Sequence, residues 1–303
     1  FLDWIYNNIT FVIQVIAVIY MVVFAIVFAI DLVKHKQDFK QKRRFVTLGI
    51  IGFVTDFLDT LSFGCFATTQ FAYRITKSSG AETLPGTLNA GHAIPALLKF
   101  VLTLGIISVD PLTLILMVSA AIIGSVAGAK VVIKMNVNVI RFCMAGALCL
   151  SGTLLLLSQL QIGPFSITGN ANGLEGPLLV VGTIGGLILG ALMSVGVGFN
   201  APCTALCNLL GMNVKAAFPI FFGGCSFTEP SAGLKFIQAW KYDRVAAALL
   251  AGPGVLGVLA AIGLVENLDT HILLWGVIVV MFYTAVTFVL DARKNIKENA
   301  TTK

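Results

Sequence analysis

Residues 52–95, GFVTDFLDTLSFGCFATTQFAYRITKSSGAETLPGTLNAGHAIP, are matched by a second hydrophobic stretch rich in Gly, Ser and Thr at residues 186–230. The residues that pair at an offset of 134 positions include Gly52 with Gly186, Gly64 with Gly198, Ala67 with Ala201, Pro85 with Pro219 and His92 with Ser226. In transporter folds, interruptions that recur in the two halves of the chain point to the binding site. The match therefore predicts two related halves with a site between them.

The composition is that of a membrane protein. The chain is 57% hydrophobic and 11% charged, whereas soluble domains carry about 25% charged residues. No Asp, Glu, Lys or Arg occurs between Phe142 and Leu174, or between Gly176 and Val214, and a helix crosses a bilayer with about 20 such residues. Because these runs are continuous and not alternating, they exclude a β-barrel. We expect an all-α polytopic membrane protein.

Basic residues indicate how the chain threads the membrane. The expected full spans are about 11–32, 84–107, 111–133, 138–159, 216–239, 245–265 and 272–290. Most Lys and Arg residues gather in the segments 34–44, 74–77, 130–141, 235–244 and 293–303. The loops 108–110, 160–176 and 266–271 contain none. The positive-inside rule then predicts the cytoplasmic membrane, with the amino terminus outside and the carboxyl terminus in the cytoplasm. The net charge of +6 thus has a topological role, and no nucleic-acid partner is expected.

Two segments are too short for the number of crossings that they would need. Segment 45–77 begins and ends on the cytoplasmic side with 33 residues, and two full crossings need about 40. We expect a broken helical hairpin that turns back near residues 59–64. Segment 177–215 is expected to do the same from the outside, near residues 196–200.

Each half then holds one hairpin and three spans. Since three is odd, the second half is predicted to be inverted relative to the first. The span 11–32 stands outside the repeat and is too long for a signal peptide. The predicted organisation has an extra amino-terminal helix with its basic loop, a first repeat, an extracytoplasmic linker, a second repeat and a cytoplasmic tail, at 1–44, 45–160, 161–176, 177–291 and 292–303.

Polar residues near the two breaks are candidates for substrate binding. Irregular backbone at membrane depth is tolerated only where protein or water surrounds it, and the amino ends of half-helices there suit an anion. The candidates carry hydroxyl, amide or imidazole groups, and they are Thr60, Ser62, Thr68, Thr69, Asn89, His92, Ser194, Asn200, Thr204, Ser226 and Thr228. Any single Ser or Thr can instead serve only in helix–helix contact.

These two stretches carry a family resemblance. Residues 52–95, together with residues 190–230, GALMSVGVGFNAPCTALCNLLGMNVKAAFPIFFGGCSFTEP, resemble the two repeats of TauE/SafE-type sulfite exporters, also called toluene-sulfonate uptake permeases. The organisation of nearly the whole chain is similar. Family members commonly show a Gly-Ile-Gly-Gly-Gly style of turn, whereas residues 62–64 read Ser-Phe-Gly and residues 195–198 read Val-Gly-Val-Gly. The resemblance implies export, or sometimes import, of sulfite, organosulfonates or related small sulfur-containing anions.

Charged residues within membrane segments are functional candidates because they are costly there. The candidates for coupling or proton relay are Asp56, Asp59, His92 and Glu229. Lys99 is expected to pair with a carboxylate. The alternatives are that Asp56 or Asp59 caps a half-helix, or that Lys99 and an acidic residue form a structural pair. Because several ionised carboxylates would repel an anion, the cluster favours a proton- or cation-linked mechanism, or a cation as substrate.

Other classes of function lack their motifs. No P-loop, dinucleotide fingerprint, HExxH or GxSxG occurs, so no cofactor is expected and the chain is not expected to be an enzyme. Asp59 with His92 is the one acid–base pair that an intramembrane enzyme would have. The six cysteines form no CxxC pair and have no His nearby in sequence, so no metal site is predicted. The expected partners are a small anion, a coupling proton or cation and the lipid bilayer; a cation or other small-anion transporter and a passive anion channel remain as alternatives.

Overall fold

The computed structural model describes residues 8–40, 45–78, 80–104, 109–163, 169–262 and 271–301. Within these ranges the chain is helical and contains no strand. Its elements are α2 (Ile9–Lys34), η1 (Lys36–Lys40), α3 (Phe45–Thr60), α4 (Cys65–Thr76), α5 (Leu84–Gly91), α6 (Ala93–Thr103), α7 (Pro111–Val132), α8 (Val137–Leu160), α9 (Gly176–Met193), α10 (Asn200–Leu209), α11 (Val214–Gln238), α12 (Arg244–Ile262) and α13 (His271–Thr301).

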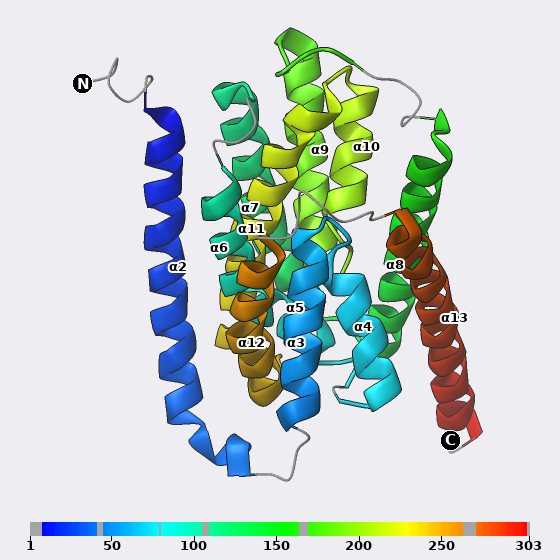
Figure 1. The fold of residues 1–303 in the computed structure, drawn as a ribbon. Helices are drawn as coiled ribbons and strands as arrows, with labels where there is room; N and C mark the ends of the chain where they lie inside the picture. The colour runs from blue at the N-terminus through cyan, green and yellow to red at the C-terminus, as the bar shows by residue number, and fades with distance from the viewer. Residues whose placement is uncertain are drawn as a thin grey trace.

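Several helices are built to contact lipid. Six of the described helices are long and apolar enough to cross a bilayer: Ile9–Lys34, Pro111–Val132, Val137–Leu160, Gly176–Met193, Arg244–Ile262 and Trp275–Lys297. Helix α2 stands at one side of the bundle (Figure 1) and exposes Phe11 at 57%, Ile19 at 58% and Val33 at 70%. Soluble proteins rarely expose continuous apolar surface of this extent. The chain is therefore a multi-pass helical membrane protein.

Most predicted spans correspond to single helices, but the predicted span 84–107 does not. It is divided at His92 into α5 and α6, and α6 ends at Thr103. The physical reason lies at Pro95, whose nitrogen has no hydrogen to donate to the carbonyl oxygen of Gly91, so the helix is weakened at that turn. Helical hydrogen bonding resumes beyond the kink, because the amide of Ala96 donates to the carbonyl of His92 at 2.9 Å. The kink brings the His92 side chain into the centre of the bundle, where it is fully buried.

The helices pack as neighbours that are far apart in sequence. Helix α3 packs against α12, α9 packs against α7, and α8 packs against α13, while α11 contacts α5, α6, α7 and α10. In Figure 1 the pair α3 and α4 occupies the lower half of the bundle, and the pair α9 and α10 occupies the upper half. Helix α2 begins at the upper end and α13 ends at the lower end. Helix α11 is therefore central to the packing of the described helices.

Two glycines that match in the sequence repeat allow close helix contacts. A Cβ atom built on Gly52 of α3 would lie 2.5 Å from the carbonyl oxygen of Leu249 in α12. A Cβ atom on Gly186 of α9 would lie 2.6 Å from the carbonyl oxygen of Met117 in α7. Small residues at such positions let the backbones of membrane helices approach closely. These contacts fix α3 and α9, the helices that lead into the two interruptions.

The lower end of α2 is joined to the start of α12 by buried polar groups. The carboxylate of Asp31 accepts hydrogen bonds from the hydroxyl of Tyr242 and, at 2.7 Å, from Nε of Arg244. Arg244 also contacts Asp38 at 3.2 Å. Helix α2 is thereby tied to the bundle at this end, although most of its length is exposed.

Candidate functional site

Two interruptions in the helices create the centre of the site. Helix α3 ends at Thr60 and α4 begins at Cys65, and the chain turns between them with positive φ angles of 72° at Ser62 and 81° at Gly64. Helix α9 ends at Met193 and α10 begins at Asn200, with a φ angle of 111° at Gly196. Both interruptions lie where the sequence predicts a break. They leave backbone groups without helical partners inside the bundle.

Gln70 joins the first pair of helices to the second interruption. Its Nε2 donates a hydrogen bond of 2.9 Å to the carbonyl oxygen of Gly196. The side chain is fully buried, and its Oε1 has no hydrogen-bond partner among the described residues. The sequence analysis missed Gln70, although it is an amide within the hydroxyl-rich segment that it singled out. A buried Gln in this segment is the signal that was available.

His92 lies at the centre of a chain of buried polar groups. Its Nδ1 is 2.8 Å from Oδ1 of Asp56 on α3, and its Nε2 is 2.9 Å from Oγ1 of Thr69 on α4. All three side chains are almost completely shielded from solvent. The pair that an intramembrane enzyme would have needed, Asp59 with His92, is not seen, because Asp56 occupies the position next to the ring. Asp59 faces a different partner.

That partner of Asp59 is Lys99. The ammonium group of Lys99 donates to Oδ2 of Asp59, and Nζ lies 4.7 Å from the centre of the Phe222 ring. The other carboxylate oxygen of Asp59 accepts a 3.1 Å hydrogen bond from the backbone N–H of Cys65, the first residue of α4. Asp59 therefore satisfies one of the free amides at this helix start. The two structural roles that the sequence left open, a helix cap and a Lys99 pair, are both found at Asp59.

Glu229 adds a third buried carboxylate to the same region. It lies on α11 with no exposed surface, and the Sγ atom of Cys65 is 3.9 Å from its Oε1. Its Oε2 has no hydrogen-bond partner among the described residues. When ionised, the three carboxylates of Asp56, Asp59 and Glu229 are opposed by the positive charge of Lys99. Ions removed from water cost several kcal/mol each unless they are compensated, so this buried charge cluster favours uptake of protons or a cation.

Most of the predicted hydroxyl candidates bond to the backbone of their own helix. The hydroxyls of this kind, with their acceptor carbonyls, are Thr60 to Asp56, Thr68 to Cys65, Ser194 to Ala191, Thr204 to Asn200 and Thr228 to Gly224. Ser226 instead donates at 2.7 Å to the carbonyl of Ala96 and so links α11 to α6. The Ser226 contact joins two helices, as the helix-packing alternative requires, whereas the bonds to the same helix do not. In both cases the hydroxyl oxygens remain available as acceptors.

The remaining candidates are spread over the two halves. Ser62 is half-buried at the first interruption. Asn200 begins α10, and its Oδ1 accepts from Sγ of Cys225 at 3.1 Å while its Nδ2 has no partner among the described residues. Asn89 lies in α5, where its Nδ2 donates to the carbonyl of Pro85 at 2.8 Å. Among the predicted binding residues that the structure describes, Thr69 and His92 are therefore the ones whose side chains bond to a side chain of the cluster or to each other.

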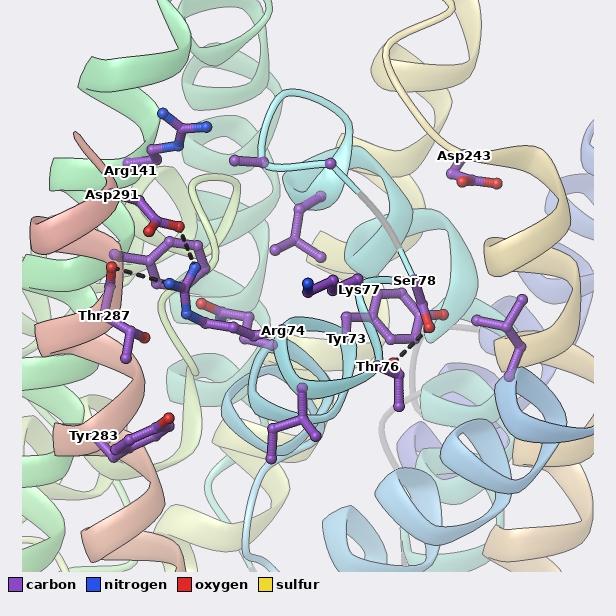
Figure 2. Close-up of a pocket in the computed structure, with 17 residues that line it drawn as sticks. Tyr73, Arg74, Thr76, Lys77, Ser78, Arg141, Asp243, Tyr283, Thr287 and Asp291 are labelled. Carbon is purple, nitrogen blue, oxygen red and sulfur yellow. Dashed lines mark hydrogen bonds and ion pairs between the residues drawn. The ribbon is translucent and has the colours of Figure 1, made fainter. Parts of the chain in front are cut away.

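A cavity opens beside α4 at the lower end of the bundle. It has a volume of about 1040 Å³, and its lining includes Gln70, Tyr73, Arg74, Lys77, Arg141 and Asp291. We call it the Arg74 cavity. Figure 2 shows Arg74 reaching toward α13, where its Nη1 lies 2.5 Å from Oδ2 of Asp291 and its Nη2 donates to the carbonyl of Thr287 at 3.2 Å.

The Arg74 cavity is connected to the helix interruptions through Gln70. This residue lines the cavity and also bonds to Gly196. The sequence analysis treated Arg74, Lys77 and Arg141 only as topological charges and so missed their convergence on one cavity. They come from α4, the segment after it, and α8, so no spacing in the sequence reveals their proximity.

Three potential metal ligands also converge in the charge cluster. One ligand atom from each of Asp56, Cys65 and His92 lies within 4.8 Å of the other two, and all three residues are buried. No metal site was expected because the cysteines form no CxxC pair and no His lies close to a cysteine in sequence. Folding brings Cys65 at the start of α4 to His92 at the kink between α5 and α6. Potential ligands are therefore present that the sequence analysis did not combine.

Comparisons with protein-family models, with curated proteins and with solved structures find no match to this chain.

Proposed function

We propose that the chain is a secondary transporter that moves small sulfur-containing anions, such as sulfite or organosulfonates, out of the cell in a proton-linked process. The observation that carries this proposal is the buried charge cluster beside the first helix interruption. One carboxylate oxygen of Asp56 and one of Glu229 in this cluster have no hydrogen-bond partner in the part of the chain that the structure describes. Ionisable groups within a membrane are typical of proton relays and ion pathways. The resemblance to TauE/SafE-type exporters supplies the class of substrate.

The proposed architecture is an inverted repeat with two re-entrant hairpins. Helices α3 with α4 and α9 with α10 would be the hairpins, lying in opposite halves of the bundle (Figure 1). Gly52 and Gly186, which match in the sequence repeat, both touch the backbone of a helix from the other half. In the sequence repeat α3 corresponds to α9 and α7 corresponds to α12, so the contact of α3 with α12 has its counterpart in the contact of α9 with α7. This reciprocity supports two related halves on either side of one site.

The proposed orientation has the lower end of the bundle in the cytoplasm of the cell. Arg74, Lys77 and Arg141 line the Arg74 cavity, which lies beside α4 in the lower half of the bundle, and η1 (Lys36–Lys40) follows the lower end of α2 (Figure 1). The positive-inside rule assigns such residues to the cytoplasm. With this orientation the Arg74 cavity faces inward and would admit a substrate that is to be exported.

Features along this route suit an anion. Three basic side chains and the carboxylates of Asp243 and Asp291 line the Arg74 cavity. The lining therefore has a net positive formal charge, which attracts an anion into a cleft. Beyond Gln70, the start of α10 has no side-chain cap, and the unpartnered Nδ2 of Asn200 lies there. Backbone amides at a helix start bind anions readily. We therefore propose that the anion rests near Asn200, while the proton is carried by Glu229 and by the Asp56–His92–Thr69 chain.

Flux of sulfite in proteoliposomes with an imposed pH gradient tests the proposal. We expect the gradient to drive sulfite movement through the wild-type chain. Glu229→Gln, which mimics a permanently protonated side chain, is expected to reduce the dependence of flux on the gradient at least tenfold. Glu82→Gln is the matched control, because Glu82 is exposed and pairs with the half-buried Lys241. Absence of gradient-driven flux for sulfite and for every sulfonate tested would refute the proposal.

A cation transporter is the second candidate, and one observation favours it. The carboxylates of the charge cluster outnumber its lysine, so the cluster attracts positive ions more readily than anions. Binding of metal cations to the purified protein, measured in competition with sulfite and a sulfonate, separates the two. A passive anion channel would show sulfite flux that follows the concentration gradient without response to pH.

A further inference from the structure

The charge cluster contains a set of side chains that matches the ligands of a transition metal. We propose that Asp56, Cys65, His92 and Glu229 bind one divalent metal ion of the zinc class. Ligand atoms of the first three residues already lie within 4.8 Å of one another. The proposal goes beyond anion transport and does not depend on which solute the chain moves.

Glu229 supplies the independent observation that a ligand belongs here. Its carboxylate approaches Cys65 through Oε1 at 3.9 Å, while its Oε2 is buried and without a hydrogen-bond partner among the described residues. Buried carboxylate oxygens in proteins are normally paired or coordinate a metal. A metal between Cys65 and His92 would give this oxygen a partner and would make Glu229 the fourth ligand.

The donor set fits zinc better than it fits harder cations. Imidazole nitrogen, thiolate sulfur and carboxylate oxygen are all zinc ligands, whereas Mg²⁺ and Ca²⁺ take oxygen alone. With metal–ligand distances of about 2.0–2.3 Å, tetrahedral ligand atoms lie about 3.3–3.8 Å apart. The present limit of 4.8 Å therefore requires movements of about 1 Å. Nδ1 of His92 is already 2.8 Å from Oδ1 of Asp56, so these two atoms must separate slightly as the metal enters between them.

The surroundings of the ligands also suit a bound ion. Thr69 Oγ1 lies 2.9 Å from Nε2 of His92, so it can accept the Nε2 hydrogen and leave Nδ1 free to bind metal. Second partners of this kind orient metal-binding imidazoles. Asp59 is excluded as a ligand because Lys99 and the Cys65 amide already occupy its oxygens. A divalent ion would offset the negative charge that Lys99 leaves uncompensated in the cluster.

Binding would join parts of the structure that a transport cycle must move. The four ligands come from α3, α4, the kink between α5 and α6, and α11. A ligand that binds only one arrangement of these helices stabilises that arrangement. We therefore expect a zinc-dependent rise in melting temperature, together with slower transport of whichever solute the chain carries.

Cobalt(II) titration of the purified full-length protein in detergent tests the site. We expect one cobalt per chain, with absorption bands of a tetrahedral centre, a thiolate-to-cobalt charge-transfer band and displacement by zinc. Cys65→Ser is expected to abolish the charge-transfer band and to weaken binding by about 10–100-fold. Cys149→Ser is the matched control, since Cys149 is an exposed thiol on α8, and it should leave the spectrum unchanged.

X-ray absorption of the zinc-loaded wild-type protein gives a second measurement that does not depend on whether a variant folds. We expect one sulfur and about three nitrogen or oxygen neighbours. No stoichiometric binding, no sulfur neighbour, or a band that survives in Cys65→Ser would overturn the proposal. Sulfite flux in chelator-treated proteoliposomes tests the transport proposal separately, because it requires no metal.

Discussion

Replacing Lys99 with methionine tests whether its contact with Asp59 is a buried charge pair. The Lys99 side chain has no exposed surface, and that of Asp59 is 5% exposed. Methionine has a similar length and keeps the apolar contacts of the lysine stem, including those near Phe222, so the substitution removes mainly the positive charge. The Asp59 carboxylate then remains in a buried site without its counterion.

The size of the effect follows from the charge that is left behind. The cheapest response of the variant is to bury the Asp59 carboxyl in its protonated form. Protonating a carboxyl group of ordinary acidity costs about 4 kcal/mol at pH 7 and about 1.5 kcal/mol at pH 5, at about 1.4 kcal/mol per pH unit. The first figure agrees with the loss of about 3–5 kcal/mol that follows removal of one partner from a buried pair. Lys99→Met is therefore expected to be much less stable at pH 7 and to recover as the pH falls.

The assay is reversible denaturant unfolding of the purified protein in detergent at pH 5, 6 and 7. Lys215→Met is the matched control, because Lys215 is exposed, and it should change the free energy of unfolding by less than about 0.5 kcal/mol. The double variant Asp59→Asn/Lys99→Met should recover most of the loss. It carries no buried charge at these positions, and the asparagine oxygen still accepts the Cys65 amide hydrogen that Asp59 accepts now.

Two results with the single variant would refute this reasoning. One is a loss below about 1 kcal/mol for Lys99→Met at pH 7, which is the size expected of an exposed pair. The other is a loss that does not change between pH 5 and pH 7, because the predicted cost comes from binding a proton. Equal stability of the single and double variants would likewise show that Asp59 does not feel the charge of Lys99.

Two further predictions concern helix packing and the anchor of α2. In Gly190→Ala the new Cβ would lie 2.0 Å from the carbonyl oxygen of Ala121, where about 3.3–3.6 Å is normal, so we expect the free energy of unfolding to fall by about 2–3 kcal/mol. Gly146→Ala is the control, because its Cβ would meet no atom within 4 Å, and it should be neutral or stabilising. Equal melting temperatures of the two variants would contradict the packing of α7 on α9. Burial and the hydrogen bond to Asp31 raise the pKa of Tyr242, so the folded protein holds this proton more tightly than the unfolded chain and wild-type stability should fall as the pH rises above about 10. Tyr242→Phe should cost about 1 kcal/mol at neutral pH and show a smaller alkaline loss, and an unchanged alkaline slope would argue against this role.

The helices could be predicted from sequence to the extent that hydropathy and proline or glycine punctuation decide them. The limits of α2, α7 and α8 follow from the apolar runs, because a membrane-spanning helix satisfies its own backbone hydrogen bonds. The interruption between Thr60 and Cys65 follows from a segment too short for two crossings. The kink at His92 was not predicted, although Pro95 is present in the sequence. A proline alone does not decide whether a membrane helix is divided, since α11 contains Pro219 and Pro230 and remains one helix.

The sequence predicted which charged residues lie in the site better than it predicted which of them contact one another. Asp56, Asp59, His92, Lys99 and Glu229 were all singled out as charged residues in apolar surroundings, and all are buried. Which aspartate meets His92 was left open by the sequence, and the structure places Asp56, and not Asp59, next to the ring. Both aspartates lie on α3 one turn apart, and which of them meets the ring depends on how α3 is rotated against the kinked segment.

By itself the sequence determined that this is a helical membrane protein with two interrupted segments and rare charges among apolar residues. It did so because a segment in lipid must satisfy its own backbone hydrogen bonds and can hold few charges, and these two requirements act on each segment whatever its neighbours are. Only the tertiary structure decided that His92 lies between Asp56 and Thr69, that Cys65 approaches Glu229, and that Gln70 reaches Gly196. Those contacts join residues distant along the chain, and they depend on helix rotation and close approach, which local periodicity does not encode.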